Sequence, residues 1–187
     1  MLLRGQKNLS YRKVFLLGIE GKVTETEYFD QFKKFHAVQY VKRCGNSPKQ
    51  ILSSLKVAMN KIALKEGDQV WIVIDRDEWR ESEIDACAAW VAKMNGKVKV
   101  GLALSNPKFE FWLLLHFEDG EGYTSQGACV QRLKCYIPNY DKHIKGYDWL
   151  DMAPQAIERA LKKLDDSSWP KKQGATTVAL LVDELLK

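Results

Sequence analysis

Acidic residues follow two apolar stretches of the sequence, at positions where their carboxylates could do chemistry. Glu20 follows the run Val14–Ile19. Asp75 and Asp77 follow the run Val70–Ile74. Each run is continuous and apolar, as in a strand that is buried on both faces of a parallel sheet. Ligands bind beyond the carboxyl ends of such strands, and residues two apart on an extended chain point the same way. If the two strands are neighbours, three carboxylates converge at one edge of the sheet.

A convergence of three carboxylates is costly without a cation, and hard oxygen ligands suit Mg²⁺ or Mn²⁺. Arg76 is the nearest base in sequence, and its side chain should point away from the two aspartates. Taken singly, a Glu-Gly after a strand is usually a turn, and an Asp-x-Asp is usually part of a loop or a cap. Their joint placement after two buried strands favours a metal site held by Glu20, Asp75 and Asp77.

The segment Gly18–Lys22, GIEGK, can also be compared with a phosphate-binding loop. A P-loop has the pattern G-x-x-x-x-G-K-[ST], whose length lets backbone N–H groups surround a phosphate. Gly18 and Gly21 are too close together for this pattern, and Val23 has no hydroxyl group for magnesium. Glu20 would repel a phosphate placed there. The segment is therefore interpreted as one wall of the metal site.

Other acids near these segments have several possible roles. Glu110 lies in the apolar segment SNPKFEFWLLLHF, and an unpaired buried carboxylate is expensive. A catalytic role, a salt bridge to a lysine and a solvent-facing position all remain open for it. Glu25 and Glu27 fall in the first turn of a helix, where acids stabilise the dipole, so capping is the simpler role, although Glu25 could reach the site. His116 is interpreted as a core histidine with satisfied hydrogen bonds.

The formal net charge of +5 is concentrated at the start of the chain. Four bases precede the first acid, Glu20, so the rest of the chain is net +1, since five minus four leaves one. A basic arm over residues 1–13 could lie along phosphates or could be an ordinary solvated terminus. The candidate nucleic-acid contacts are Arg12, Lys13, Lys22 and, more weakly, Lys142.

The elements that position these residues alternate between strands and helices. Strands are predicted at Val14–Ile19, Val38–Val41, Val70–Ile74 and Lys97–Leu104. Helices are predicted after the N-caps Thr24, Ser47 and Ser82, with Glu27 completing a capping box at the first. This order predicts parallel βα units with helices on both faces of the sheet.

The pattern changes after Leu104. A turn is predicted at Ser105-Asn106-Pro107, followed by a buried helix over Phe109–Phe117 and a polar loop over Glu118–Gly127. The remaining predicted helices are roughly Ala128–Ile137, Leu150–Asp165 and Thr176–Leu186. The chain is predicted to be one domain with a basic arm (1–13), an α/β core (14–117) and a mainly helical C-terminal part (118–187).

Length and composition fit one ordinary soluble domain, with 187 residues of which 45% are hydrophobic and 28% charged. No stretch approaches the run of about 20 apolar residues that a membrane span needs. The first ten residues lack the apolar centre of a signal peptide, so a cytoplasmic location is expected. The four cysteines form no C-x-x-C pair and no zinc-like spacing, which predicts four buried, reduced thiols.

Three segments, EGKVTETEYF, VIDRDEW and SNPKFEFWLLLHF, resemble the signature segments of the RloB-like family, which belongs to the TOPRIM superfamily. The resemblance runs from about Val14 to Phe117, with a weaker similarity at GATTVALLV. It implies a TOPRIM-like fold, a mostly parallel sheet flanked by helices with a helical C-terminal part. It also implies that Glu20 is a metal ligand or general acid/base, and that Asp75 and Asp77 are magnesium ligands. Glu110 falls in a family hallmark of less clear role.

RloB-like proteins are associated with bacterial restriction loci and abortive phage infection, often beside an ATPase partner. The leading hypothesis is a Mg²⁺- or Mn²⁺-dependent phosphodiesterase, a nuclease acting on DNA or RNA, with tRNA among the candidate substrates, in antiphage defence. Its candidate catalytic residues are Glu20, Asp75, Asp77 and Glu110. An alternative is a non-catalytic module that docks on and regulates an ATPase. A third hypothesis is phosphoryl or nucleotidyl transfer by the same acids.

Overall fold

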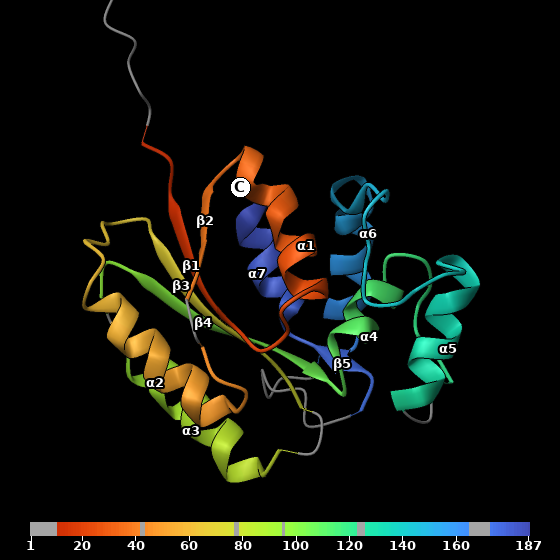
Figure 1. Ribbon diagram of the computed structural model, residues 1–187, viewed down its shortest axis with the longest axis horizontal. Helices are drawn as coiled ribbons and strands as arrows, with labels where there is room; N and C mark the ends of the chain where they lie inside the picture. Colours follow the sequence, from red (N-terminus) through yellow and green to blue (C-terminus); the bar gives the residue numbers. More distant parts are fainter. Residues whose placement is uncertain (1–10, 42–43, 77–78, 95, 123–125, 165–172) are drawn as a thin grey trace, which may run out of the picture.

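A mostly parallel sheet forms the centre of the protein (Figure 1). The computed structural model describes residues 11–41, 44–76, 79–94, 96–122, 126–164 and 173–187. Within these residues the strand order is β2-β1-β3-β4-β5, with β5 antiparallel and the other pairs parallel. The strands are β1 (Val14–Ile19), β2 (Ala37–Tyr40), β3 (Gln69–Asp75), β4 (Lys99–Asn106) and β5 (Ala175–Thr176). The predicted α/β class is confirmed.

Helices cover both faces of the sheet, which explains why its central strands are continuously apolar. The helices are α1 (Thr24–Asp30), the 3-10 turn η1 (Gln31–Lys34), α2 (Pro48–Met59), α3 (Glu81–Lys93), α4 (Phe109–Leu114), α5 (Gln126–Tyr136), α6 (Trp149–Leu161) and α7 (Val178–Leu185). In Figure 1, α2 and α3 lie on one face, and α1, α4, α6 and α7 lie on the other. Along β3, Ile72 packs into the core under α2 and α3, whereas Trp71 and Val73 face the larger core on the other side.

The structure corrects the predicted end of the fourth strand. Strand β4 continues through Asn106, because Ser105 and Asn106 pair with β5. The predicted turn is therefore wrong at its first two residues, and the chain turns only at the cis peptide bond between Asn106 and Pro107. The helix predicted from Thr176 begins instead at Val178, since Thr176 belongs to β5.

One predicted N-cap is confirmed and two are wrong. The Ser47 side chain accepts a hydrogen bond from the backbone N–H of Gln50, as predicted for the start of α2. Helix α3 begins at Glu81, before Ser82. Thr24 lies inside α1, where its hydroxyl donates to the carbonyl oxygen of Lys142 (2.8 Å). For Thr24, a contact with a distant segment has taken the place of the predicted local cap.

The prediction of four buried thiols is correct for three of them. Cys44, Cys87 and Cys129 are buried, and burial raises the pKa of the first two thiols to about 11 and of the third to about 12. Cys135 is exposed, because it falls on the outer side of α5. Across the described part of the chain, none of the helices has the length and apolar character needed to cross a membrane.

Candidate functional site

A cavity of about 380 Å³ opens at the carboxyl ends of β1 and β3. These strands are neighbours in the sheet, with Ile19 in register with Val73, so Glu20 and Asp75 reach the same edge. Four acids line the cavity, Glu20, Glu25, Asp75 and Glu110, together with three lysines, Lys22, Lys108 and Lys142. The arrangement combines carboxylates that could bind a cation with ammonium groups that could bind a phosphate.

Glu20 is half-buried and fixed between the ends of two strands. Its backbone N–H donates to the carbonyl oxygen of Val73 (3.1 Å), which extends the pairing of β1 with β3 by one residue. One carboxylate oxygen accepts from the backbone N–H of Asp75 (3.3 Å), and the other accepts from Nε1 of Trp79 (3.1 Å). These donors orient the carboxylate towards the edge of the sheet.

Asp75, the last residue of β3, is half-buried and lies beside Glu20 at the cavity. Asp77, the third predicted ligand, lies outside the described residues. Among the residues that the structure does describe, no group of three or more Asp, Glu, His or Cys side chains could hold a metal ion. The described part of the predicted site therefore consists of the pair Glu20 and Asp75.

Glu25 lines the cavity, and its carboxylate also accepts a hydrogen bond from its own backbone N–H in the first turn of α1. Its side chain is buried, and burial raises the pKa of its carboxyl group to about 7, with further raising contributions from Glu110 and Glu20. It packs so closely on Gly21 that a Cβ atom there would lie 1.9 Å from Oε2 of Glu25. Gly21 itself was the available sequence signal, because its missing side chain leaves the space that this carboxyl group fills.

Glu110 lies at the start of α4 and contacts the C-terminal part of the chain. Its Oε1 accepts a hydrogen bond from the Tyr140 hydroxyl (2.9 Å), and that hydroxyl lies 3.4 Å from the Thr24 hydroxyl. Glu110 is half-buried and lines the cavity, so of the three alternatives left open by the sequence a fully solvent-exposed position is not what the structure has. Thr24 holds the backbone of Lys142, so this network ties the loop after α5 to the mouth of the cavity.

Glu27 also holds the loop that follows α5. Its carboxylate accepts from the backbone N–H of Ile144 (2.9 Å) and pairs with Nδ1 of His143 (2.7 Å). These contacts replace the capping box that the sequence predicts, because they take up both carboxylate oxygens. Burial, which opposes ionisation, is outweighed by these partners, so the pKa of Glu27 is lowered.

The three lysines reach the cavity from different parts of the chain. Lys22 and Lys142 are exposed, so their ammonium groups are accessible to a ligand in the cavity. Lys108 is half-buried directly before α4, and sequence reasoning missed it. Its position in SNPKFEFW, two residues before Glu110, was the signal that could have identified it.

The other two predicted nucleic-acid contacts lie elsewhere. Arg12 and Lys13 precede β1, at the opposite end of that strand from Glu20. Six residues of strand separate them from the site, a distance of about 20 Å. The guanidinium group of Arg12 donates to the carbonyl oxygens of Lys33 and His36. The structure therefore does not bring these two residues to the cavity.

His116 is a core residue, as predicted. It is buried among aromatic rings, with Nε2 3.1 Å from the Tyr28 hydroxyl and Nδ1 3.0 Å from the carbonyl oxygen of Trp112. Burial lowers the pKa of this imidazole to about 4. The histidine therefore serves the packing of α4 and is not a lining residue of the cavity.

A family model described as RloB-like protein matches residues 15–185. The chain belongs to the RloB-like family. No curated protein and no solved structure showed a significant match to it. The matched region includes the loop that carries Tyr140 and Lys142, so the helical C-terminal part lies within the RloB-like region along with the sheet.

Two carboxylates of this RloB-like protein, Glu20 and Asp75, are of the type that binds a hard divalent cation. Glu20 and Asp75 offer carboxylate oxygens from adjacent strands, and magnesium is commonly held by one or two such groups. Glu25 and Glu110 add two more carboxyl groups to the same cavity, and their mutual repulsion contributes to the raised pKa of Glu25. A bound cation would relieve that repulsion.

Proposed function

We propose that this RloB-like protein is a metal-dependent phosphodiesterase, a nuclease acting on DNA or RNA, with tRNA among its candidate substrates. The observation that carries the proposal is the cavity at the ends of β1 and β3, where acids and lysines lie together. A metal-dependent nuclease can use both, because a metal ion must be held while a phosphate of the substrate is positioned beside it. The association of the family with restriction loci and phage infection supports a role in antiphage defence.

Glu20 and Asp75, together with Asp77, would hold Mg²⁺ or Mn²⁺. When bound, such an ion lowers the pKa of water and stabilises the leaving oxygen of an in-line displacement at phosphorus. Lys22, Lys108 and Lys142 bind the phosphate oxygens of the substrate. They come from three separate segments, so they can approach one phosphate group from different sides.

Glu25 and Glu110 have different roles in this proposal. Glu25 lies inside the cavity, where its carboxyl group can accept a proton from the attacking water or give one to the leaving oxygen. Glu110 is a positioning residue, because its hydrogen bond to Tyr140 holds the loop that presents Lys142. Loss of Glu110 should therefore raise KM more than it lowers kcat.

A cleavage assay tests the proposal. The purified protein is incubated with end-labelled single-stranded DNA, duplex DNA, RNA and tRNA in Mg²⁺, in Mn²⁺ and in EDTA. We expect cleavage that EDTA abolishes, and a loss of at least about 100-fold in Glu20→Gln and in Asp75→Asn. The matched control is Asp85→Asn, on the exposed side of α3, which should cleave like the wild type. Equal cleavage by Asp75→Asn and the wild type would exclude this mechanism.

The second candidate is a non-catalytic module that docks on and regulates a partner ATPase. It is favoured by the hydrogen bonds to Glu20, both of whose carboxylate oxygens already accept from donors of the protein. This function requires stable co-purification with an ATPase and no binding of divalent ions. Calorimetry distinguishes the two candidates, because metal binding that is lost in Asp75→Ala supports the phosphodiesterase and contradicts the module.

A further inference from the structure

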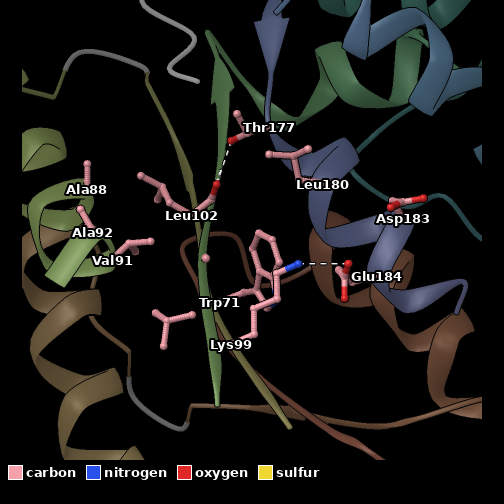
Figure 2. A pocket seen from close by; sticks show the side chains of 12 residues that line it. Trp71, Ala88, Val91, Ala92, Lys99, Leu102, Thr177, Leu180, Asp183 and Glu184 are labelled. Carbon is pink, nitrogen blue, oxygen red and sulfur yellow. Dashed lines mark hydrogen bonds and ion pairs between the residues drawn. The ribbon is translucent and has the colours of Figure 1, made fainter. Parts of the chain in front are cut away.

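A second cavity, of about 560 Å³, runs along the outer edge of β4 (Figure 2). It lies far from the acidic cavity in the fold, towards the amino end of the strand. Its floor is the edge of β4, and its two walls come from α3 and α7. The wall residues are Ala88, Val91 and Ala92 of α3 and Leu180, Asp183 and Glu184 of α7. We call this cavity the β4 groove.

The direction of the backbone groups along β4 follows from its pairing with β3. The N–H of Lys99 donates to the carbonyl oxygen of Asp68, and the carbonyl oxygen of Ser105 accepts from Arg76, so these residues face β3. In a parallel ladder alternate residues face opposite neighbours. Val100 and Leu102 therefore direct their backbone N–H and C=O groups into the β4 groove.

Within the described residues, only the carboxyl-terminal half of this edge of β4 has hydrogen-bond partners. Strand β5 pairs with Ser105 and Asn106 alone. The hydroxyl of Thr177 then accepts from the N–H of Leu104 (2.8 Å) and donates to the carbonyl oxygen of Leu102 (2.9 Å), as Figure 2 shows for the second bond. The N–H of Leu102 and both backbone groups of Val100 have no partner in the described part of the chain.

The two helical layers extend beyond the last strand. Helix α3 packs on one face of β4 and α7 packs on the other, and residues of both helices line the space outside the strand. Inner strands of the sheet lie between the same two layers. The space therefore has the position of a missing strand, which would lie about 4.8 Å from β4. A folded domain would meet the helices first, whereas a single extended chain can enter.

The α3 wall of the groove is apolar, whereas the α7 wall combines Leu180 with the acids Asp183 and Glu184. Val91, Leu102 and Leu180 are apolar and partly or fully exposed, and Ala88 and Ala92 are small. The edge lysine, Lys99, is of a kind that often prevents strand pairing. Its Nζ lies 3.0 Å from Glu184, so its charge is held at the α7 wall and away from the backbone groups (Figure 2).

We propose that the β4 groove binds an extended segment of a partner protein, which adds to β4 as a further strand. Main-chain hydrogen bonds to Val100 and Leu102 supply affinity, and alternate apolar side chains of the segment pack against the α3 and α7 walls. This interaction is independent of the phosphodiesterase chemistry, because the groove shares no lining residue with the acidic cavity.

The test uses the full chain and a phage-displayed library of random 12-residue peptides as the probe. Peptides selected on the wild type are then measured on Val100→Pro and on Val100→Ala by fluorescence anisotropy. The proline removes one groove-facing N–H, and edge strands tolerate it. The alanine keeps that N–H and also shortens the side chain. We expect binding to be about tenfold weaker for Val100→Pro and within about threefold of wild type for Val100→Ala.

Amide hydrogen exchange on the wild type with a selected peptide provides a second readout, which does not depend on the folding of a variant. The amides of Val100 and Leu102 should gain protection, whereas that of Gly101, which faces β3, should not change. Peptides that bind both variants equally, or that leave the Leu102 amide unprotected, would overturn the proposal. So would a wild-type dimer that becomes a monomer in Val100→Pro, because a second copy would then occupy the groove.

Discussion

Gly21 and Glu25 act as one structural unit, because the glycine leaves the space in which the buried carboxyl group lies. This relation explains the glycine of the Glu-Gly pair more fully than a turn does. The backbone N–H of Gly21 also stabilises the charged form of Glu25 by a hydrogen bond. At the scale of single residues, the acidic cavity therefore depends on a missing side chain as well as on its carboxylates.

Gly21→Ala tests this relation. The new methyl group would displace the flexible Glu25 carboxyl group from its buried position, so we expect a marked loss of cleavage with a change of less than about 1 kcal/mol in the free energy of unfolding. Chemical denaturation measures the second effect. The control is Gly127→Ala in α5, where a Cβ meets nothing within 4 Å and the change should be neutral or slightly stabilising. A Gly21→Ala protein that cleaves as well as the wild type would contradict the role of Gly21 in placing Glu25.

Glu25→Gln tests the raised pKa of the carboxyl group. The pKa is about 7 in the folded protein and 4.5 in the unfolded chain, so the native state binds more protons between these values. Stability must therefore fall as the pH rises from about 4.5 to about 7. The difference corresponds to roughly 3 kcal/mol at most. In EDTA, the glutamine variant should be more stable than the wild type at pH 8 and should show a flatter dependence of Tm on pH. Parallel Tm curves for the two proteins would disprove the assignment.

At the scale of elements, the sequence predicted best what depends on local patterning. Buried parallel strands have continuously apolar sequences, so β1 and β3 were predicted within one residue at each end. The same prediction placed Glu20 and Asp75 near each other. Strand β5 could not be predicted, because a strand of two residues is too short to show an alternation of apolar and polar residues. Tyr140 could not be placed either, since its contact with Glu110 depends on the path of a loop 30 residues further along the chain.

The short β5 strand and the residue after it fix the end of β4, and Thr177→Val tests this. Valine has a similar shape but removes the hydroxyl that bonds to Leu104 and Leu102. Because the N–H of Leu104 is then left unpaired in a buried position, we expect a loss of about 1–3 kcal/mol in the free energy of unfolding. Ser53→Ala, on the exposed face of α2, should change it by less than about 0.5 kcal/mol. Equal effects of the two substitutions would contradict this role of Thr177.

At the scale of the whole molecule, positive charge is found at both ends of β1. Lys22, Lys108 and Lys142 surround the acidic cavity, whereas Arg12 and Lys13 lie at the far end of the strand. A nucleic acid must cross about 20 Å to contact both groups. A dinucleotide is much shorter than this distance, so it reaches one group of bases, whereas a 20-nucleotide single strand can reach both.

Two sets of substitutions separate these groups of bases. Lys108→Ala should weaken the binding of both a dinucleotide and a 20-nucleotide single strand, and should reduce the slope of log K against log salt by about 0.7 for the longer strand. Arg12→Ala plus Lys13→Ala should weaken only the longer strand. Fluorescence anisotropy in Ca²⁺, which replaces Mg²⁺ to slow cleavage, measures both. An unchanged salt slope in Lys108→Ala would remove this lysine from the interface.

The central claim is that Glu20 and Asp75 share a divalent ion at the end of the parallel sheet. The most direct measurement is anomalous diffraction from crystals of the protein soaked in Mn²⁺, with Asp75→Asn crystals as the control. We expect a manganese peak between the carboxylates of Glu20 and Asp75 that is absent in the variant. Crystals of the wild type with no peak at this position would contradict the claim, as would a peak that persists unchanged in Asp75→Asn.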